Sequence, residues 1–189
     1  EVVVPPRTRP HAVRQFVEAH RDWIQHTRDE LDVTGPPPLL FLPDHIALRI
    51  NGEAYSVTYG HKTPRRGWQE TGPSRLELSY QRANYTMGRR ALRDWLRHKG
   101  REILIPRLAQ RAQAMDTSYR QLQVRGQRTR WGSYSSNGTL SINYCLLFMP
   151  ADLADYLFIH ELCHTCHMNH SARFWQLVSR FAPNYRAQE

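Results

Sequence analysis

The chain has 189 residues and a mass of 22.2 kDa, enough to bury a core as one domain or as two small units that share one. Its composition, 40% hydrophobic and 23% charged, is that of a soluble globular protein, and it has no apolar run of about 18 residues that would span a membrane. Three cysteines are an odd number, which argues against a disulfide framework and makes a reducing cytoplasm the expected location.

Positive charge is concentrated in the middle of the chain. The net charge is +9, and residues 60–130 alone carry 17 Lys and Arg against 5 Asp and Glu, a net of +12. Two interpretations of this segment remain open. It binds a polyanion such as nucleic acid or a nucleotide, or it forms an arginine-rich helix surface that is simply solvated.

The N-terminal part predicts one helix and several strands. Residues 1–4 are a β-branched, strand-like run, and Pro10 opens a helix that apolar spacing extends to about residue 31. Strands are predicted at residues 45–50, 54–59 and 75–80. Asn51-Gly52 is a hairpin turn between the first two of them. We therefore expect residues 1–83 to form a β-rich N-terminal region with a helix at about 10–31.

The C-terminal part predicts three helices and a pair of strands. The first helix covers residues 84–114, with Pro106 kinking or splitting it. Strands are predicted at residues 122–130 and 139–143, around a turn at residues 136–138. The second helix starts near Pro150, and the last runs from Ser171, a good cap, to about residue 181. Residues 84–189 are thus expected to form a second domain.

Residues 160–170 contain the pattern H-E-x-x-H and a further histidine six residues later. His160 and His164, four apart on the second helix, lie about 5–6 Å from each other at Cβ and can converge on one ion. With His170 they form a set of three nitrogens that leaves one coordination position open, which is typical of a catalytic zinc site. Glu161 is offset from the two ligands and well placed to take a proton from the attacking water.

His170 cannot reach the ion from a straight helix, because it would be rotated roughly 240° from His164 and lie some 9 Å further along the axis. The chain must therefore bend after about Cys166. Asn169 tolerates the left-handed backbone conformation that such a turn often uses. His167, the fourth histidine of the segment, is interpreted as a surface residue. The alternative is that it contacts one of the metal ligands and helps to orient it.

A second motif overlaps the first. Cys163, Cys166 and His167 form C-x-x-C-H, the attachment pattern of c-type haem, but that interpretation leaves His160 and His170 unexplained. A zinc or redox pair of the two cysteines is a further alternative. Packing of small side chains in a buried helix is the interpretation that we favour.

Several short motifs occur in a specific order over about 60 residues of the C-terminal half. They are R-T-R-W-G-S at 128–133, S at 135 and G at 138, L-S-I-N at 140–143, D-Y at 155–156, H-E-L-C-H at 160–164, N-H-S at 169–171 and F-W at 174–175. With E-A-H-R-D-W-I at 18–24, the chain resembles the bacterial YgjP-like metallopeptidase family, which is related to the SprT and WLM zinc proteases.

That resemblance implies an α+β fold, a minimal zincin in which a small, mostly antiparallel sheet lies over the active-site helix. It implies one Zn²⁺ ion held by His160, His164 and His170, with Glu161 as the catalytic residue. The strand at 139–143 would border the cleft and bind peptide by strand addition. Tyr134 and Cys145 stand where the family usually has Cys and Arg. The metzincin label fails, because His167 occupies the glycine position of that motif and no methionine follows His170.

The function that we expect is that of a zinc metallopeptidase acting on a peptide or protein substrate, with no membrane partner. Tyr134, Tyr144 and Arg130 are candidates for stabilising the oxyanion. One alternative is a metal-dependent hydrolase of nucleotides or phosphoanhydrides, with phosphate held by the basic segment. Another is a DNA-associated binding module that uses the same segment without catalysis.

Overall fold

The computed structural model describes residues 10–22, 42–60, 67–80 and 84–188. The chain divides into two units, residues 1–41 and residues 42–189. The described part of the first unit is the helix α1 (Pro10–Ala19), which starts at the predicted proline, followed after a turn by helical residues 21–22. The strand predicted at residues 1–4 and the rest of the helix predicted to residue 31 lie outside the described residues.

The second unit begins with a four-stranded sheet. Its strands are β1 (His45–Leu48), β2 (Glu53–Tyr59), β3 (Trp68–Gly72) and β4 (Arg75–Leu78), in the order β1-β2-β4-β3. β1 and β2 form the predicted hairpin, in which Gly52 takes a φ of 76°, a left-handed value that favours glycine. The three predicted strands are confirmed, whereas β3, antiparallel to β4, was not predicted.

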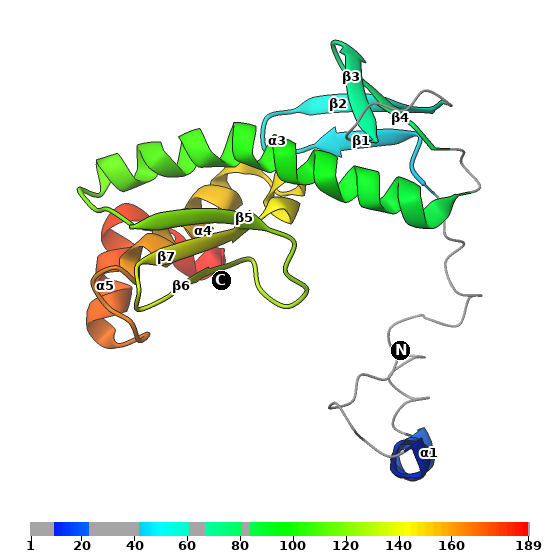
Figure 1. Ribbon diagram of the computed structural model, residues 1–189. Helices are drawn as coiled ribbons and strands as arrows, with labels where there is room; N and C mark the ends of the chain where they lie inside the picture. Colours follow the sequence, from blue (N-terminus) through cyan, green and yellow to red (C-terminus); the bar gives the residue numbers. More distant parts are fainter. Residues whose placement is uncertain (1–9, 23–41, 61–66, 81–83, 189) are drawn as a thin grey trace. The chain divides into compact units, whose positions relative to one another are not determined.

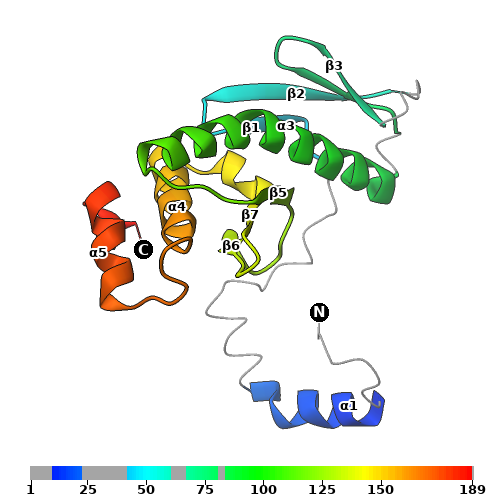
Figure 2. The same cartoon turned by 60° about the vertical axis from the view of Figure 1, so that its left-hand side comes forward.

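A single long helix, α3 (Tyr85–Ala114), follows the sheet. The side chain of Asn84 caps it by accepting a hydrogen bond from the N–H of Met87. The predicted splitting at Pro106 is wrong, because the helix is continuous over 30 residues and the ring lies on its exposed side. α3 contacts strands of both sheets of this unit, and Figures 1 and 2 show it running between them.

The second sheet has three strands, β5 (Gln121–Arg125), β6 (Gly132–Tyr134) and β7 (Thr139–Asn143), in the order β5-β7-β6. β5 is parallel to β7, and β6 is antiparallel to it. The strand predicted at 122–130 therefore ends five residues early, at Arg125. The turn at 136–138 joins β6 to β7, and the small sheet is mixed, with one parallel and one antiparallel pairing.

The remaining elements are helical. They are the 3₁₀ helix η1 (Tyr144–Phe148), α4 (Ala151–Cys163), α5 (Ala172–Phe181) and the 3₁₀ helix η2 (Tyr185–Ala187). α4 is fixed to α3 by an ion pair that spans 48 positions: Arg107 donates to both carboxylate oxygens of Asp155, at 2.6 and 2.9 Å, and Arg111 donates to the same carboxylate. The helices predicted near 150 and at 171–181 are confirmed.

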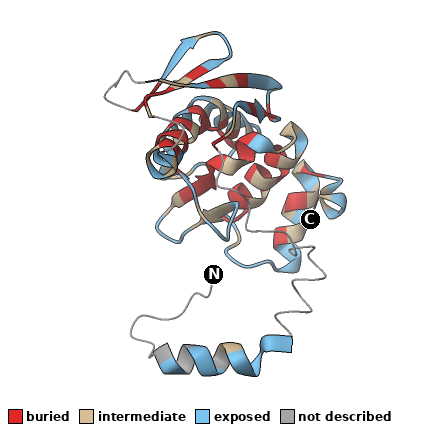
Figure 3. Ribbon diagram, turned by 90° about the vertical axis from the view of Figure 1, so that its right-hand side faces the viewer, coloured by how far each residue is buried: buried red, intermediate tan, exposed pale blue. Residues whose placement is uncertain are grey.

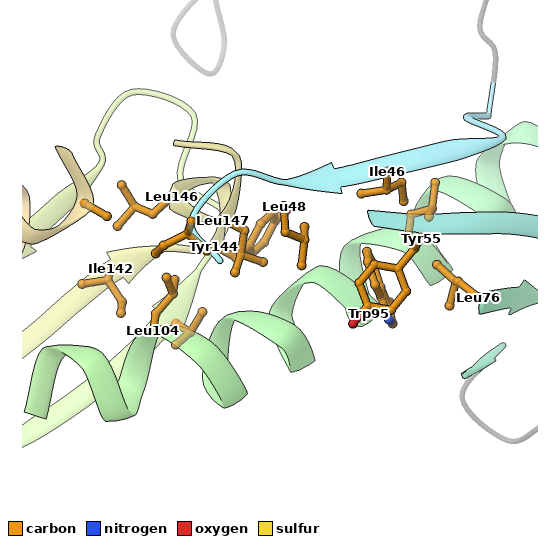
Figure 4. Close-up of a cluster of buried hydrophobic side chains, with 14 of the residues drawn as sticks. Ile46, Leu48, Tyr55, Leu76, Trp95, Leu104, Ile142, Tyr144, Leu146 and Leu147 are labelled. Atoms are coloured by element: carbon orange, nitrogen blue, oxygen red, sulfur yellow. The ribbon is translucent and has the colours of Figure 1, made fainter. Parts of the chain in front are cut away.

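One large hydrophobic core joins the two sheets, α3 and α4. Trp95 and Leu104 of α3 contribute to it together with Leu76 and Ile142 from the two sheets, as Figure 4 shows. A smaller cluster between α4 and α5 is formed by Tyr156, Ile159, Cys163, Phe174, Val178 and Ala182. Figure 3 shows buried residues gathered on the sheets, α3 and α4. The α+β class is confirmed, and the domain boundary at residues 83/84 stays a prediction.

None of the helices in the described ranges has the length and apolar character needed to cross a membrane.

Candidate metal centre

Three histidines converge at the end of α4. The ligand nitrogens of His160, His164 and His170 all lie within 4.8 Å of one another. The Nε2 atoms of His160 and His170 are 3.0 Å apart. Two nitrogens bound tetrahedrally to one zinc ion at about 2.0–2.1 Å are separated by about 3.3 Å. The three side chains are thus grouped closely enough to hold a single small ion, once the larger separations shorten on binding.

The backbone brings His170 back by ending α4 early. The helix stops at Cys163, three residues before the bend that we predicted, and His164 is its C-cap. The N–H groups of Cys166 and His167 then donate to the carbonyl of Cys163, at 3.1 and 3.0 Å. The expected left-handed Asn169 is wrong, because the non-glycine residues with positive φ in the described ranges are Ser74 and Asp116. The reversal is therefore built from tight turns of ordinary handedness.

His164 is oriented by a backbone carbonyl. Its Nδ1 lies 2.9 Å from the carbonyl oxygen of His167, which can only accept, so Nδ1 carries the proton and Nε2 is left for a metal. Its ring also stacks on Phe174, with 4.6 Å between centroids. The half-exposed His167 side chain is not one of the three converging ligands, and this residue supports the site through its main chain.

His170 is held by aromatic stacking. Its ring stacks on Trp175 at 5.6 Å, and Trp175 in turn stacks on Tyr185 at 5.3 Å. Such a stack restrains both the position and the tilt of the exposed His170 ring. The motif containing Trp175 pointed to this region, but nothing in the sequence indicated that Tyr185 belongs to it.

Two of the three histidines, His160 and His164, favour the neutral form that binds metal. Burial, with the nearby charges of His164 and then His170, lowers the pKa of His160 to about 4. Burial also lowers the pKa of His164. Since a neutral imidazole is the ligand, His160 is ready to coordinate an ion at neutral pH without first losing a proton.

Glu161 is a buried carboxyl group with few polar interactions. Burial raises its pKa to about 7, an effect that the positive charge of Arg130 partly opposes. Its Oε2 has no hydrogen-bond partner among the described residues. A Cβ atom on Gly132 would lie only 2.7 Å from its Oε1, so that glycine leaves the space for the carboxyl group. A buried, unpaired carboxyl that titrates near neutrality has the properties of a general base.

A cavity of about 420 Å³ opens beside His160 and Glu161. Much of its wall is apolar, from Trp131, Leu146, Met149, Leu153 and Leu157. Arg130 is a polar group on the same wall, whereas Tyr134 and Tyr144, the other two oxyanion candidates, do not line this cavity. The hydroxyl of Tyr144 is instead directed at Gly126, where an added Cβ would lie 2.3 Å away.

The loop that carries Arg130 and Trp131 is anchored by Asn143. The buried amide of Asn143 donates to the carbonyls of Gln127 at 2.8 Å and Arg130 at 3.0 Å, and its N–H donates to the carbonyl of Trp131. A buried residue at the end of β7 thus fixes the wall of the cavity. The sequence placed Asn143 in a motif without indicating this role.

The expectation that β7 borders the cleft is wrong. β7 is the central strand, paired on both sides, and β6 is the strand at the edge of the sheet. β6 contacts α4 and begins with Gly132, directly against Glu161. The edge available for adding a peptide strand next to the site is therefore that of β6.

The three cysteines are unpaired. Cys163 is fully buried in the cluster between α4 and α5, and burial raises its pKa to about 12. Cys166 is exposed. Cys163 therefore has the environment of a packing residue.

Comparison with known proteins identifies a family and a similar solved structure. A model of the family described as YgjP-like, metallopeptidase domain, matches residues 1–189. The chain is also similar to the crystal structure of the metallopeptidase zymogen of Pyrococcus abyssi abylysin, with 24% identity and a TM-score of 0.38, over 43% of this chain and 81% of the other. No curated protein matches the chain.

Proposed function

Because the chain belongs to the YgjP-like family of metallopeptidase domains, and so is a metal-dependent peptide hydrolase, we propose that His160, His164 and His170 hold one zinc ion and that Glu161 is its catalytic base. The observation that carries this proposal is the convergence of three imidazoles beside a buried carboxyl group that has an oxygen without a hydrogen-bond partner among the described residues. Three nitrogen ligands with one open position are the donor set of catalytic zinc rather than of structural zinc.

A zinc ion held by the three histidines would supply Lewis acidity for the scissile carbonyl and for water. Glu161 accepts the proton of the attacking water, since its pKa of about 7 makes it a base of suitable strength at neutral pH. It then returns that proton to the leaving amine. We propose that Arg130, which lines the same cavity, stabilises the negative charge on the carbonyl oxygen.

The substrate is proposed to lie as an extended strand along β6. Its main chain would pair with the free edge of the sheet, which brings a scissile bond past Gly132 to Glu161. The cavity walled by Trp131, Leu153 and Leu157 then accepts a large apolar side chain next to that bond. Among the described residues that line the cavity, Arg130 is the one arginine or lysine, so the site favours a peptide over a phosphoanhydride.

The test compares Glu161→Gln, His164→Asn and a matched control, His167→Asn, which keeps the main-chain carbonyl that orients His164. Zinc content is measured after purification, and cleavage is measured on casein and on a peptide library. We expect Glu161→Gln to retain zinc and lose at least about 100-fold in kcat/KM. His164→Asn should lose zinc and activity, and His167→Asn should keep both.

Two results would contradict the proposal. A wild-type protein that purifies and rebinds no zinc would remove the metal site. Full cleavage of peptides by Glu161→Gln would remove this residue as the base. Cleavage after or before charged residues alone would separately reject the apolar subsite.

A further inference from the structure

Five arginines of α3 lie on one side of the helix. They are Arg89, Arg90, Arg93, Arg97 and Arg101, and together we call them the arginine face. At 100° per residue they occupy an arc of roughly 120°, and at 1.5 Å per residue they extend over about 18 Å. Four of the five side chains are exposed and Arg97 is half-buried. Four of them, Arg89, Arg93, Arg97 and Arg101, follow one another at intervals of four residues, about one per turn, and Arg90 adjoins the first.

Few of the charges on the arginine face are neutralised by ion pairs within the fold. Among the described residues, the carboxylate that pairs with it is Asp94, 2.8 Å from Arg97, and the two side chains are 46% and 40% exposed. The other basic residues of α3 behave differently. Lys99 is buried and pairs with Glu102, and Arg107 and Arg111 hold Asp155. The basic residues of α3 that pair within the fold are thus different from those of the arginine face. Most charges of the arginine face remain available to an external partner.

The surface around the arginine face is hollowed and partly aromatic. Two adjoining cavities of about 570 and 450 Å³ share Arg90, Asp94 and Arg97 as wall residues. Rings line both of them: Tyr80 and His98 are in the first, beside the mostly buried Trp68, and Tyr85 is in the second. A third cavity of about 350 Å³ continues from Arg97 and Arg101 to Arg125 of β5. Cationic groups interleaved with rings in a groove are the features that bind single nucleic acid strands.

We propose that the arginine face binds the sugar–phosphate backbone of a nucleic acid. The arginines are spread over about 18 Å, so no single phosphate or mononucleotide can engage them together, whereas a chain of phosphodiesters can. A membrane surface fits less well. The large hydrophobic side chains exposed in the described ranges are Trp131, Phe148 and Met168, none of which is on α3. Nucleic-acid binding does not depend on the peptidase proposal, because the arginine face and the cavity at Glu161 share no wall residues.

The test measures binding of the full-length, metal-loaded protein to fluorescent DNA by anisotropy. One arm uses a single strand of about 20 nucleotides, and a second uses the corresponding duplex. A third arm uses vesicles containing phosphatidylserine. The variant Arg93→Glu/Arg101→Glu is compared with Arg173→Glu/Arg180→Glu, which changes two exposed arginines of α5 and gives the same net charge.

We expect the wild type to bind DNA at ~50 mM salt and to release it as salt rises. The Arg93→Glu/Arg101→Glu variant should bind at least about tenfold more weakly, and its salt slope should be lower by about 1.4 for a single strand. The α5 variant should change affinity less than about twofold. The ratio between the single-strand and duplex arms identifies the form of nucleic acid that the surface prefers.

Three results would overturn the proposal. They are no DNA binding at low salt, equal losses in the α3 and α5 variants, and binding to vesicles but not to DNA. Circular dichroism melting and peptidase activity serve as controls for folding, because both should be unchanged in both variants. Loss of DNA binding with retained peptidase activity would confirm that the two surfaces are separate.

Discussion

Glu161 shows how a functional residue weakens the fold that holds it. The pKa of this carboxyl group rises from 4.5 to about 7 on folding. The ionised form therefore lowers the free energy of unfolding relative to the protonated form. Its contribution to folding is therefore fully present below about pH 4.5 and is lost as the pH rises through about 7. The group is buried, so the loss is not screened by solvent.

This gives a first prediction. In metal-free protein, Glu161→Gln should be more stable than the wild type at pH 8, by up to about 3 kcal/mol, and the difference should vanish below about pH 4.5. Urea unfolding in the presence of a chelator measures it. The histidines titrate in both proteins and cancel in the comparison. A difference that stays constant with pH would show that Glu161 does not have the raised pKa.

Gly132 is a second residue whose role is spatial. An added Cβ would lie 2.7 Å from both Cγ and Oε1 of Glu161, closer than such atoms approach, so Gly132→Ala must displace the carboxyl group or β6. We predict at least a tenfold loss of kcat/KM, about 1.4 kcal/mol in the barrier, with zinc content unchanged. Gly72→Ala is the control, because nothing lies within 4 Å of its Cβ position. Unaltered kinetics in Gly132→Ala would contradict this tight fit.

At the scale of elements, the placement of α4 depends on one carboxylate. Asp155 is 8% exposed and receives three hydrogen bonds from Arg107 and Arg111, which come from the C-terminal third of α3. Since α4 ends in His160 and His164, this pair also sets where the metal ligands stand. The aromatic stack of Trp175 and Tyr185 does the same for His170 from the other side.

Asp155→Asn should therefore lower the free energy of unfolding by about 1–3 kcal/mol, less than for a fully buried pair, because both arginines are about one-third exposed or more. Asp94→Asn, which removes an exposed pair on the same helix, should cost less than about 0.5 kcal/mol. Chemical denaturation of the two variants under identical conditions measures the contrast. Equal effects would mean that Asp155 does not fix α4.

Local signals predicted the elements well where a residue type forces a conformation. Pro10 and Asn51-Gly52 mark a helix start and a hairpin, and both are present. Pro106 failed as a breaker, because it lies on an exposed face of a long helix whose other side is buried against two sheets. The parallel pairing of β5 with β7 was not predicted, since partners separated by about 18 residues leave no mark in either strand.

Contacts between distant parts of the chain also limited what the sequence could predict about the metal centre. Spacing alone predicted that His160, His164 and His170 converge, because it needs only the helix repeat and a bend. It did not predict the carbonyl of His167, the aromatic stack of Tyr185, or the edge position of β6. These depend on contacts between elements that only the folded chain brings together.

At the scale of the whole molecule, the second unit has two hydrophobic clusters of unequal size. The larger joins both sheets with α3, and the smaller joins α4 to α5. The three histidines connect the end of α4 to the segment before α5, so a bound ion would supplement the smaller cluster more than the larger one.

We therefore predict that a chelator changes amide hydrogen exchange unevenly. Protection should fall in residues 164–182, and the amides of α3 around Trp95 and Leu104 should keep theirs. Mass spectrometry of peptic fragments with and without zinc measures this. Uniform loss of protection across both regions would indicate that the metal stabilises the entire unit as one cooperative structure.

Cys166 has a practical consequence for such work. It is exposed, whereas Cys163 is buried and has a pKa of about 12, and Cys145 is half-buried with a pKa raised by burial. Thiol reagents should therefore modify the native protein at Cys166 first. This residue lies between His164 and His170, in the turns that bring the last ligand into place. A fluorophore attached there would respond to metal binding in that segment, and it requires no engineered labelling site.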